Sequence, residues 1–275
     1  MANYMNKIMV DTRFKTAGSS SNSNFTIEIN DNVNLSDNIG AMITDVVIPR
    51  TFYNITAYNN TFYFRVYTNN NLNFNDYFIR LEPQNYSIIS LADDLKSGME
   101  SLTSLQFEVT SNFDTGKIRI DIISSNVSGL RFFTNDELKT RINKTWNGDF
   151  YNINELNSVN DVIRNTGLSI INDNNNKFLI GVVDLLGIHN IYIKSSVLSN
   201  FSNIGPQGER NIVSKIITNA QYGDVIIYHN YLSEDYVDCS NRSLKIIDFQ
   251  ITDVYGREID LNGSNVTFSI LFFKT

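Results

Sequence analysis

Several residue types are scarce in this chain of 275 residues, which has one cysteine, two histidines, three prolines and one tryptophan. The single cysteine, Cys239, cannot form an internal disulfide, so we expect assembly in a reducing compartment. No apolar run reaches the roughly 18 residues of a membrane-spanning helix, and no apolar N-terminal segment has the form of a secretory leader. The sequence therefore predicts neither a membrane span nor a signal peptide.

Basic residues are also in the minority. The 22 lysines and arginines are outnumbered by 29 acidic residues, which gives a net charge of −7 and an isoelectric point near 4.9. Binding to nucleic acid through its phosphates needs a basic surface. The composition therefore argues against direct nucleic-acid binding.

The motifs of common enzyme and metal sites are missing from the sequence. The two histidines, His189 and His229, are far apart and form no H-x-H pair, so we interpret both as strand-end or loop residues. Neither a G-x-S-x-G nucleophile motif nor a G-x-x-x-x-G-K-[ST] phosphate loop occurs. In the run that resembles a calcium loop, from Asp173 through Asn175 to Lys177, a cation stands where a ligand is needed. We expect a protein that is not an enzyme and that holds no cofactor or metal.

Strand-forming residues, in contrast, are abundant. Alanine is scarce, whereas β-branched and aromatic residues are frequent, and this balance favours strands over helices. Many short strand-like runs with few helices between them predict an all-β fold, namely a single jelly-roll β-sandwich with one or two short helices and long loops. The runs lie at 24–29, 40–49, 61–67, 77–82, 105–110, 117–123, 177–183, 189–196, 211–218, 224–230, 243–253 and 265–273.

Two helices are expected among these strands. Ser87 is a good N-cap, and apolar residues follow it at helical spacing at Ile88, Leu91, Leu95 and Met99. A second, shorter helix is expected at 134–140. It opens the polar stretch 134–176, which we interpret as a long inserted loop or a small subdomain. The only tryptophan, Trp146, lies in this stretch and either anchors it on the core or lies at a subunit interface.

The stretch VDTRFKTAGSSSNSNFTIEI, Val10–Ile29, sets the expected domain boundary. Its small polar residues at 17–24 predict a flexible connection, so we expect an N-terminal arm at 1–16 and the sandwich domain at 17–275. On an extended arm, Asp11, Arg13 and Lys15 would share one face, opposite Phe14, and would suit docking on a neighbouring subunit. The alternative is an ordinary edge strand with a solvated charged face. If the arm is separate, deleting 1–16 should preserve the fold and weaken assembly.

A second candidate contact lies in the loop IGPQGERN at 204–211, where glycine and proline predict turns. Glu209 and Arg210 in this loop either contact a neighbouring subunit or are simply solvated.

Six stretches, taken in order, resemble a known protein family. They are VDTRFKT with NFTIEI; ITDVVIPRTFYNI; LEPQNYSIISLADDL; FFTNDELK followed by NSVNDVIRNT; GVVDLLGIHNIYIKSSVLSNFSNIGPQGERNIVSKI; and LKIIDFQITDVYGREIDLNGSNVTFSILF. Together they span Val10–Phe272 and resemble the penton, or minor capsid, proteins of virophages and of Polinton/Maverick virus-like elements.

The resemblance implies a viral structural protein, a single jelly roll whose strands stand upright on the capsid. Five copies would form a ring at each five-fold vertex, among trimers of a double-jelly-roll major capsid protein. The expected partners are therefore further copies of the chain and the major capsid protein, with a host receptor or fibre as a further partner at the outer loops.

Two other classes compete with this interpretation. Fourteen tyrosines could serve as stacking platforms of a carbohydrate- or receptor-binding β-sandwich. A jelly-roll glycoside hydrolase would need two carboxylates about 5–10 Å apart across a cleft, which a sequence does not reveal.

Overall fold

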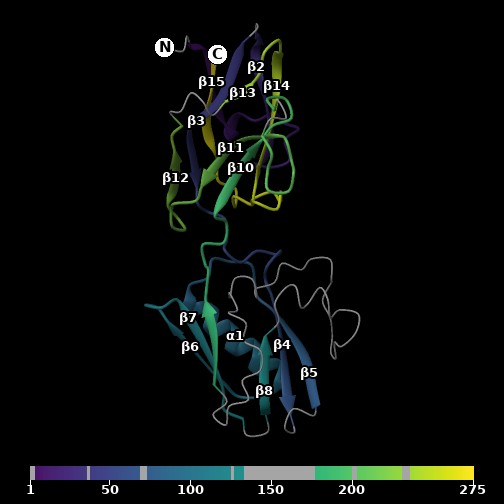
Figure 1. The fold of residues 1–275 in the computed structure, drawn as a ribbon, viewed down its shortest axis with the longest axis vertical. Coiled ribbons are helices and arrows are strands. Elements are labelled where there is room, and N and C mark those ends of the chain that lie inside the picture. The colour runs from purple at the N-terminus through teal and green to yellow at the C-terminus, as the bar shows by residue number, and fades with distance from the viewer. Residues whose placement is uncertain are drawn as a thin grey trace. The chain divides into compact units, whose positions relative to one another are not determined.

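The computed structural model describes residues 4–35, 38–68, 73–124, 127–132, 177–199, 203–230 and 236–275. The chain divides into two compact units (Figure 1). Unit 1 comprises Met1–Phe52 and Ile188–Thr275, and unit 2 comprises Tyr53–Gly187. The second unit is thus inserted into the first, and it is much larger than the insertion expected at 134–176. That stretch and the helix expected at 134–140 lie outside the described residues, as does Trp146.

Unit 1 contains two antiparallel sheets. Sheet A has the order β1 (Tyr4–Asp11), β15 (Thr267–Lys274), β3 (Ile39–Pro49), β12 (Val225–Tyr228), and the short β13 (Val237–Asp238) also pairs with β3. Sheet B has the order β11 (Ile212–Ile217), β10 (Asn190–Lys194), β14 (Ser243–Thr252), β2 (Asn24–Asn34).

The order of these strands is that of a jelly roll. If the strands of unit 1 other than β13 are numbered from one to eight along the chain, sheet A reads 1-8-3-6 and sheet B reads 5-4-7-2. Each sheet therefore combines strands from both ends of the sequence, as two interlocked Greek keys require. The all-β jelly-roll sandwich predicted from the sequence is confirmed.

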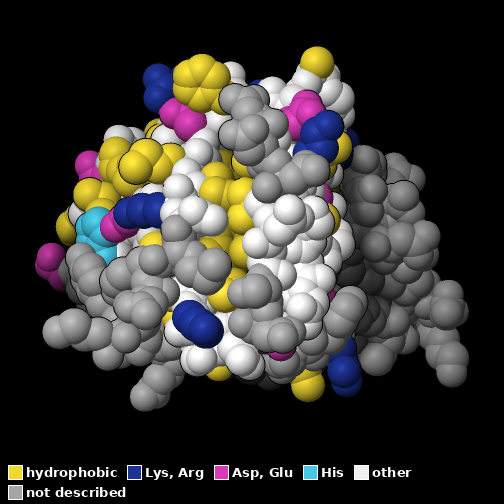
Figure 2. Space-filling model, turned by 90° about the horizontal axis from the view of Figure 1, so that it is seen from above, with side chains coloured by type: hydrophobic (Ala, Val, Ile, Leu, Met, Phe, Trp, Pro, Cys, Tyr) yellow, Lys and Arg dark blue, Asp and Glu magenta, His cyan; other side chains and the backbone are white. Residues whose placement is uncertain are grey.

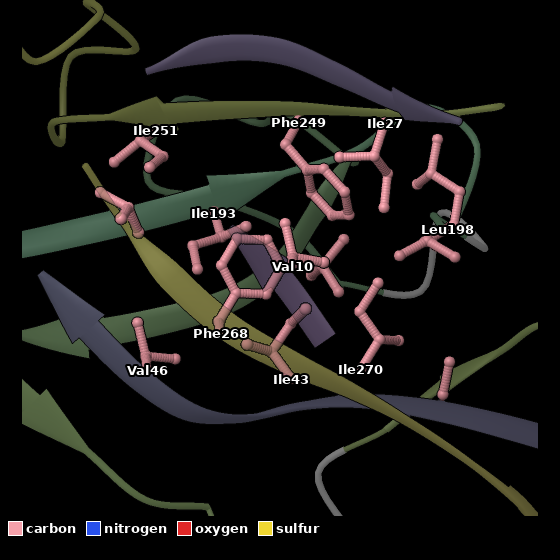
Figure 3. Packing of buried hydrophobic residues seen from close by; sticks show 14 of the residues in the cluster. Val10, Ile27, Ile43, Val46, Ile193, Leu198, Phe249, Ile251, Phe268 and Ile270 are labelled. Carbon is pink, nitrogen blue, oxygen red and sulfur yellow. The ribbon is translucent and has the colours of Figure 1, made fainter. Parts of the chain in front are cut away.

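The two sheets bury their inner faces against each other. Phe249 and Ile27 from sheet B point toward Phe268 and Ile43 from sheet A (Figure 3). The ring of Phe249 packs edge-on against that of Phe268, with centroids 5.0 Å apart. Alternating apolar residues thus form one continuous core, as in other aligned sandwiches.

Unit 2 has a core of its own. One sheet has the order β5 (Asn73–Arg80), β4 (Thr61–Thr68), β8 (Val127–Phe132), and another has the order β6 (Phe107–Asn112), β7 (Lys117–Ile122), β9 (Lys177–Val182). Helix α1 (Ile88–Thr103) begins at the expected N-cap, Ser87, which forms a capping box with Ser90. Its apolar face, including Leu91, Leu95 and Met99, is fully buried in this core.

An ion pair is buried in the hairpin of β4 and β5. Arg65 donates from Nε and Nη2 to the two carboxylate oxygens of Asp76, at 2.6 and 2.8 Å. The two side chains are only 7% and 0% exposed, and the guanidinium lies 3.8 Å from the centre of the Phe74 ring. Burial has the largest single effect and would lower the pKa of Arg65, but hydrogen bonds and charge interactions with Asp76 and Tyr67 together raise it. Each charged group therefore compensates the other for the hydration that both lose on burial.

We expect Asp76→Asn to destabilise this hairpin by about 3 kcal/mol, because it leaves a buried guanidinium without its counter-ion. Hydrogen exchange of the β4 and β5 amides would measure the loss. Asp121→Asn is the matched control, because the pair of Arg119 and Asp121 has side chains that are 41% and 19% exposed. Equal effects of the two substitutions would contradict the argument.

The N-terminal segment is part of sheet A and does not form a separate arm. Strand β1 pairs with β15 from Tyr4 to Asp11, and the Val10 side chain is 2% exposed in the core between the sheets. The boundary expected after residue 16 is thereby corrected. The alternating residues that suggested an arm are equally typical of an edge strand, and here the face with Val10 is buried in the core between the sheets.

Deletion of residues 1–16 should therefore lower the thermal stability of the chain strongly. It would remove an edge strand, leave the backbone of β15 unpaired along that edge and take Val10 out of the core. Circular dichroism melting of the truncated and full chains would measure the effect. A truncated chain with an unchanged melting temperature would restore the arm interpretation.

Candidate assembly site

The expected contact residues Asp11, Arg13, Phe14 and Lys15 lie where β1 ends and a turn begins. Residues Thr12–Phe14 form a short 3₁₀ turn, η1, and the Asp11 carboxylate caps it by accepting from the Arg13 backbone N–H at 2.9 Å. The same carboxylate also accepts from Arg13 Nε at 3.0 Å. Hydrogen bonding by the Arg13 side chain lowers the pKa of Asp11, against the opposing effect of burial. The two residues thus form a local ion pair at the edge of the sheet.

The turn breaks the alternation expected for these residues. Thr12 is fully buried: its N–H donates to the Val266 carbonyl at 3.1 Å, and its hydroxyl accepts from the Val266 N–H at 3.0 Å. Phe14, in contrast, is 80% exposed. The expectation that Asp11, Arg13 and Lys15 share a face opposite Phe14 is therefore wrong. Arg13 and Phe14 instead project together into solvent.

The small polar tract at 17–24 is tied down by hydrogen bonds. The Lys15 ammonium donates to the Asn22 side-chain oxygen at 2.7 Å, and the Asn22 amide donates to the carbonyls of Gly263 and Ser264 at 3.1 and 2.9 Å. Ser23 is 1% exposed, and its hydroxyl donates to the Ile259 carbonyl. The flexible connection expected from composition is thus a loop fixed to the turn before β15.

Glu209 fastens its loop to sheet B. Its carboxylate accepts from the Lys194 ammonium of β10 at 3.3 Å and from the Gln207 N–H at 2.9 Å. The Lys194 side chain is only 8% exposed. Burial would raise the pKa of Glu209, but backbone N–H groups and Lys194 together lower it. Its neighbour Arg210 is exposed, and its carbonyl accepts from the Ser199 hydroxyl at 2.6 Å.

The expected contact residues therefore fall into two groups. Asp11, Arg13, Phe14 and Lys15 follow the edge strand of sheet A, whereas Glu209 and Arg210 precede the edge strand of sheet B. Their role in contacts between subunits stays a prediction.

A further surface feature, not foreseen from the sequence, is the outer face of sheet A. Met9 on β1 is 80% exposed, and Val225 and Ile227 on β12 are 46% and 54% exposed. The sequence held no signal for them, because Ile8–Val10 and Val225–Ile227 are unbroken apolar runs whose outward residues only the structure distinguishes.

Charged groups join three strands across this face. Asp45 of β3 accepts from the Lys7 ammonium of β1 at 2.6 Å and lies 3.2 Å from Nδ1 of His229, just after β12. The hydrogen bond from Lys7 lowers the pKa of Asp45 despite partial burial. Figure 2 shows hydrophobic, acidic, basic and histidine side chains next to one another in the view from above. The face is therefore amphipathic, with features suited to a protein contact.

Within the described ranges, no group of three histidine, cysteine, aspartate or glutamate side chains could hold a metal ion. No helix in the part of the chain that the structure describes has the length and apolar character to cross a membrane. Cys239 is fully buried, its thiol donates to the Leu198 carbonyl at 3.4 Å, and burial raises its pKa to about 11. The thiol at this position is a core group and is not activated for reaction.

Comparisons with known proteins bear on the fold. No family model matches the sequence, and no curated protein matches it. Among solved structures, the crystal structure of selenomethionine-labelled mavirus penton protein matches with a TM-score of 0.56 and 10% sequence identity. The chain shares the fold of the mavirus penton protein. The match covers 98% of this chain and 100% of that chain, so it extends across both units.

Glu209→Gln should destabilise the chain by about 1–2 kcal/mol, because it leaves the buried Lys194 ammonium without a charged acceptor. Glu28→Gln on the same sheet should change stability by less than about 0.5 kcal/mol, because its pair with Lys245 is long and exposed. Urea unfolding would compare the two variants.

The effect of Glu209→Gln should also depend on pH. A lowered pKa stabilises the fold above the ordinary carboxyl pKa, and this stabilisation is lost as the pH falls through the folded-state value. The difference between the wild type and Glu209→Gln should therefore shrink below about pH 4. A difference that grows on acidification would contradict the assigned ion pair.

Proposed function

We propose that this chain is a penton, or minor capsid, protein. Five copies form the ring that closes each five-fold vertex of an icosahedral capsid, and the ring contacts a double-jelly-roll major capsid protein. The observation that carries the proposal is the jelly-roll order of unit 1 together with a fold likeness to a penton protein over nearly the whole of both chains. The protein would act in the virion after assembly in the reducing interior of a host cell.

The physical form of unit 1 supports a role in assembly. A ring of identical subunits needs two unlike surfaces on each subunit, so that contacts run head to tail and close after five rotations. The two edges of sheet A are β1 and β12, which differ in length, charge and apolar content. A sandwich with a continuous core keeps such edges at a fixed separation.

The titratable groups also fit a structural role. Among the residues that the structure describes, every carboxylate whose pKa is lowered accepts hydrogen bonds that fix a strand or a turn. This holds for Asp11, Asp45, Glu209, Asp238 and Asp248. We therefore propose that the work of the chain is assembly, without catalysis and without a cofactor.

The proposal is tested at two levels. Native mass spectrometry and sedimentation of the full chain at high concentration should reveal a pentamer in equilibrium with monomer. Electron microscopy of the particle should show density that fits this chain at the five-fold vertices. Five-fold vertices occupied by some other chain would overturn the proposal.

A further inference from the structure

The register of sheet A determines which residues of its two edge strands lie at the same position along the strand direction. We call this position their height. Asp11 pairs with Thr267, Thr267 pairs with Val47, and Val47 pairs with Ile227, so these four residues form one row across the sheet. Strands β1 and β3 run in the same direction, because both are antiparallel to β15. Residues just after Asp11 are therefore level with Pro49 and with its partner on β12, Val225. Three strand spacings, about 14 Å, separate the two edges.

The β1 edge presents basic and apolar groups at this height. We define it as Arg13 and Phe14. Phe14 is 80% exposed, and the Arg13 side chain is 64% exposed. Asp11 receives hydrogen bonds from Nε and Nη2 of Arg13. The planar guanidinium has further N–H donors on Nη1, which point away from a bidentate partner.

The β12 edge presents acidic and apolar groups at the same height. We define it as Asp224, Val225 and Ile227. Asp224 is exposed, and Val225 and Ile227 are 46% and 54% exposed. The backbone of Asp224 is fixed, since its carbonyl accepts from the Arg50 N–H at 2.8 Å and its N–H donates to the Gln221 carbonyl at 3.0 Å. The β12 edge thus has a carboxylate where the β1 edge has a guanidinium, and both edges expose apolar side chains.

We propose that the β1 edge of one copy packs against the β12 edge of a second copy of this chain. Phe14 would contact Val225 and Ile227, and Arg13 would pair with Asp224. The inference rests on the proposed function and names the surfaces that make the ring. A rotation about an axis parallel to the strands leaves the height of every residue unchanged, so edges at the same height can meet in a closed ring. The contact joins two unlike surfaces, as such a ring requires.

The exposed isoleucines of sheet B, one on its edge strand β11 and one on the inner strand β14, do not meet the same condition. They are Ile217 on β11 and Ile246 on β14, which are 63% and 53% exposed. Tyr192 pairs with Thr252, and this pair defines a row across β10 and β14. Ile217 pairs with Asn190, which lies two residues to one side of that row. Ile246 lies six residues to the other side of the row of Tyr192 and Thr252. The two offsets add, so more than about 20 Å along the strands separates the side chains of Ile217 and Ile246. Rotation about the same axis cannot bring them together.

Cross-linking of the full chain tests the pairing. Cys239 is fully buried, so engineered surface cysteines would be the accessible thiols among the described residues. A double variant Phe14→Cys and Val225→Cys, treated with a short bifunctional maleimide at high concentration, should give a ladder of covalent oligomers that ends at five. A mixture of the two single variants should give mainly dimers of one variant with the other. The matched control, Ile217→Cys with Ile246→Cys, should give no ladder.

A charge swap tests the pairing independently. Asp224→Lys should raise the concentration needed for association about fivefold, the equivalent of one exposed ion pair, and the double variant Arg13→Glu with Asp224→Lys should restore it. Glu108→Lys in unit 2 makes the same charge change at another exposed position and should have no such effect. Melting temperatures of all variants would verify that folding is intact.

The outcomes separate this inference from the proposed function. Absence of the ladder from the Phe14 and Val225 variant, or an equal ladder from the sheet B control, overturns the pairing of these edges. If the wild-type chain sediments as a pentamer under the same conditions, only the assignment of surfaces fails. If it stays monomeric and the vertices contain another chain, the penton function fails as well.

Discussion

The packing of sheet A against sheet B is the interaction on which unit 1 depends. At its centre, the rings of Phe249 and Phe268 meet nearly at right angles with centroids 5.0 Å apart, and the ring centroid of Phe25 lies 5.5 Å from that of Phe249. Such aromatic pairs add about 0.5–1.5 kcal/mol to what burial alone provides. The three rings come from β2, β14 and β15, so the contact brings the start and the end of the chain together. The edges of both sheets take their positions from this core.

Insertion of unit 2 leaves that core intact because the inserted chain is held at its own base. Asn54, 3% exposed, donates to the carbonyls of Tyr86 and Leu185 at 2.8 and 3.2 Å and accepts from the Tyr86 N–H at 2.8 Å. Gly187 has a φ of +70°, and an added Cβ would lie 3.1 Å from the Asn54 Cα. One buried amide therefore fastens the first residues of unit 2 to its last ones. A connection between two strands of a jelly roll can hold a whole unit when its ends are fixed side by side.

Much of the fold could be predicted from the sequence, for reasons that lie in local pattern. Helix α1 followed from Ser87 and the spacing of Leu91 and Leu95, and the buried run of β3 followed from its continuous apolar residues. The division into two units could not be predicted, because strands of both units have the same alternation and only their pairing partners differ.

The candidate site was harder to predict, because it depends on contacts between residues distant in sequence. Thr12 is held in the core by Val266, more than 250 positions away, whose carbonyl accepts from the Thr12 N–H and whose N–H donates to the Thr12 hydroxyl. The exposed apolar residues of β1 and β12 lie in unbroken apolar runs, so the sequence did not distinguish them from their buried neighbours. The equal height of the two edges depends on the register of β15 between β1 and β3, which no local pattern encodes.

The edges of sheet A also raise a question that any assembling β-protein must answer, because an open strand edge can pair with the wrong chain. Strand β12 has only four residues, which limits backbone pairing along its edge. Near the middle of the sheet, Asp45 adopts a left-handed φ of +49°, where the register of β3 against β15 shifts. Bulges increase the local twist of a sheet, and a short edge strand offers few backbone groups, so both hinder the pairing of another strand. Association through side chains at fixed heights is then favoured over continuous strand pairing, and a contact made of side chains can close into a ring where a contact made of strand pairing would extend the sheet.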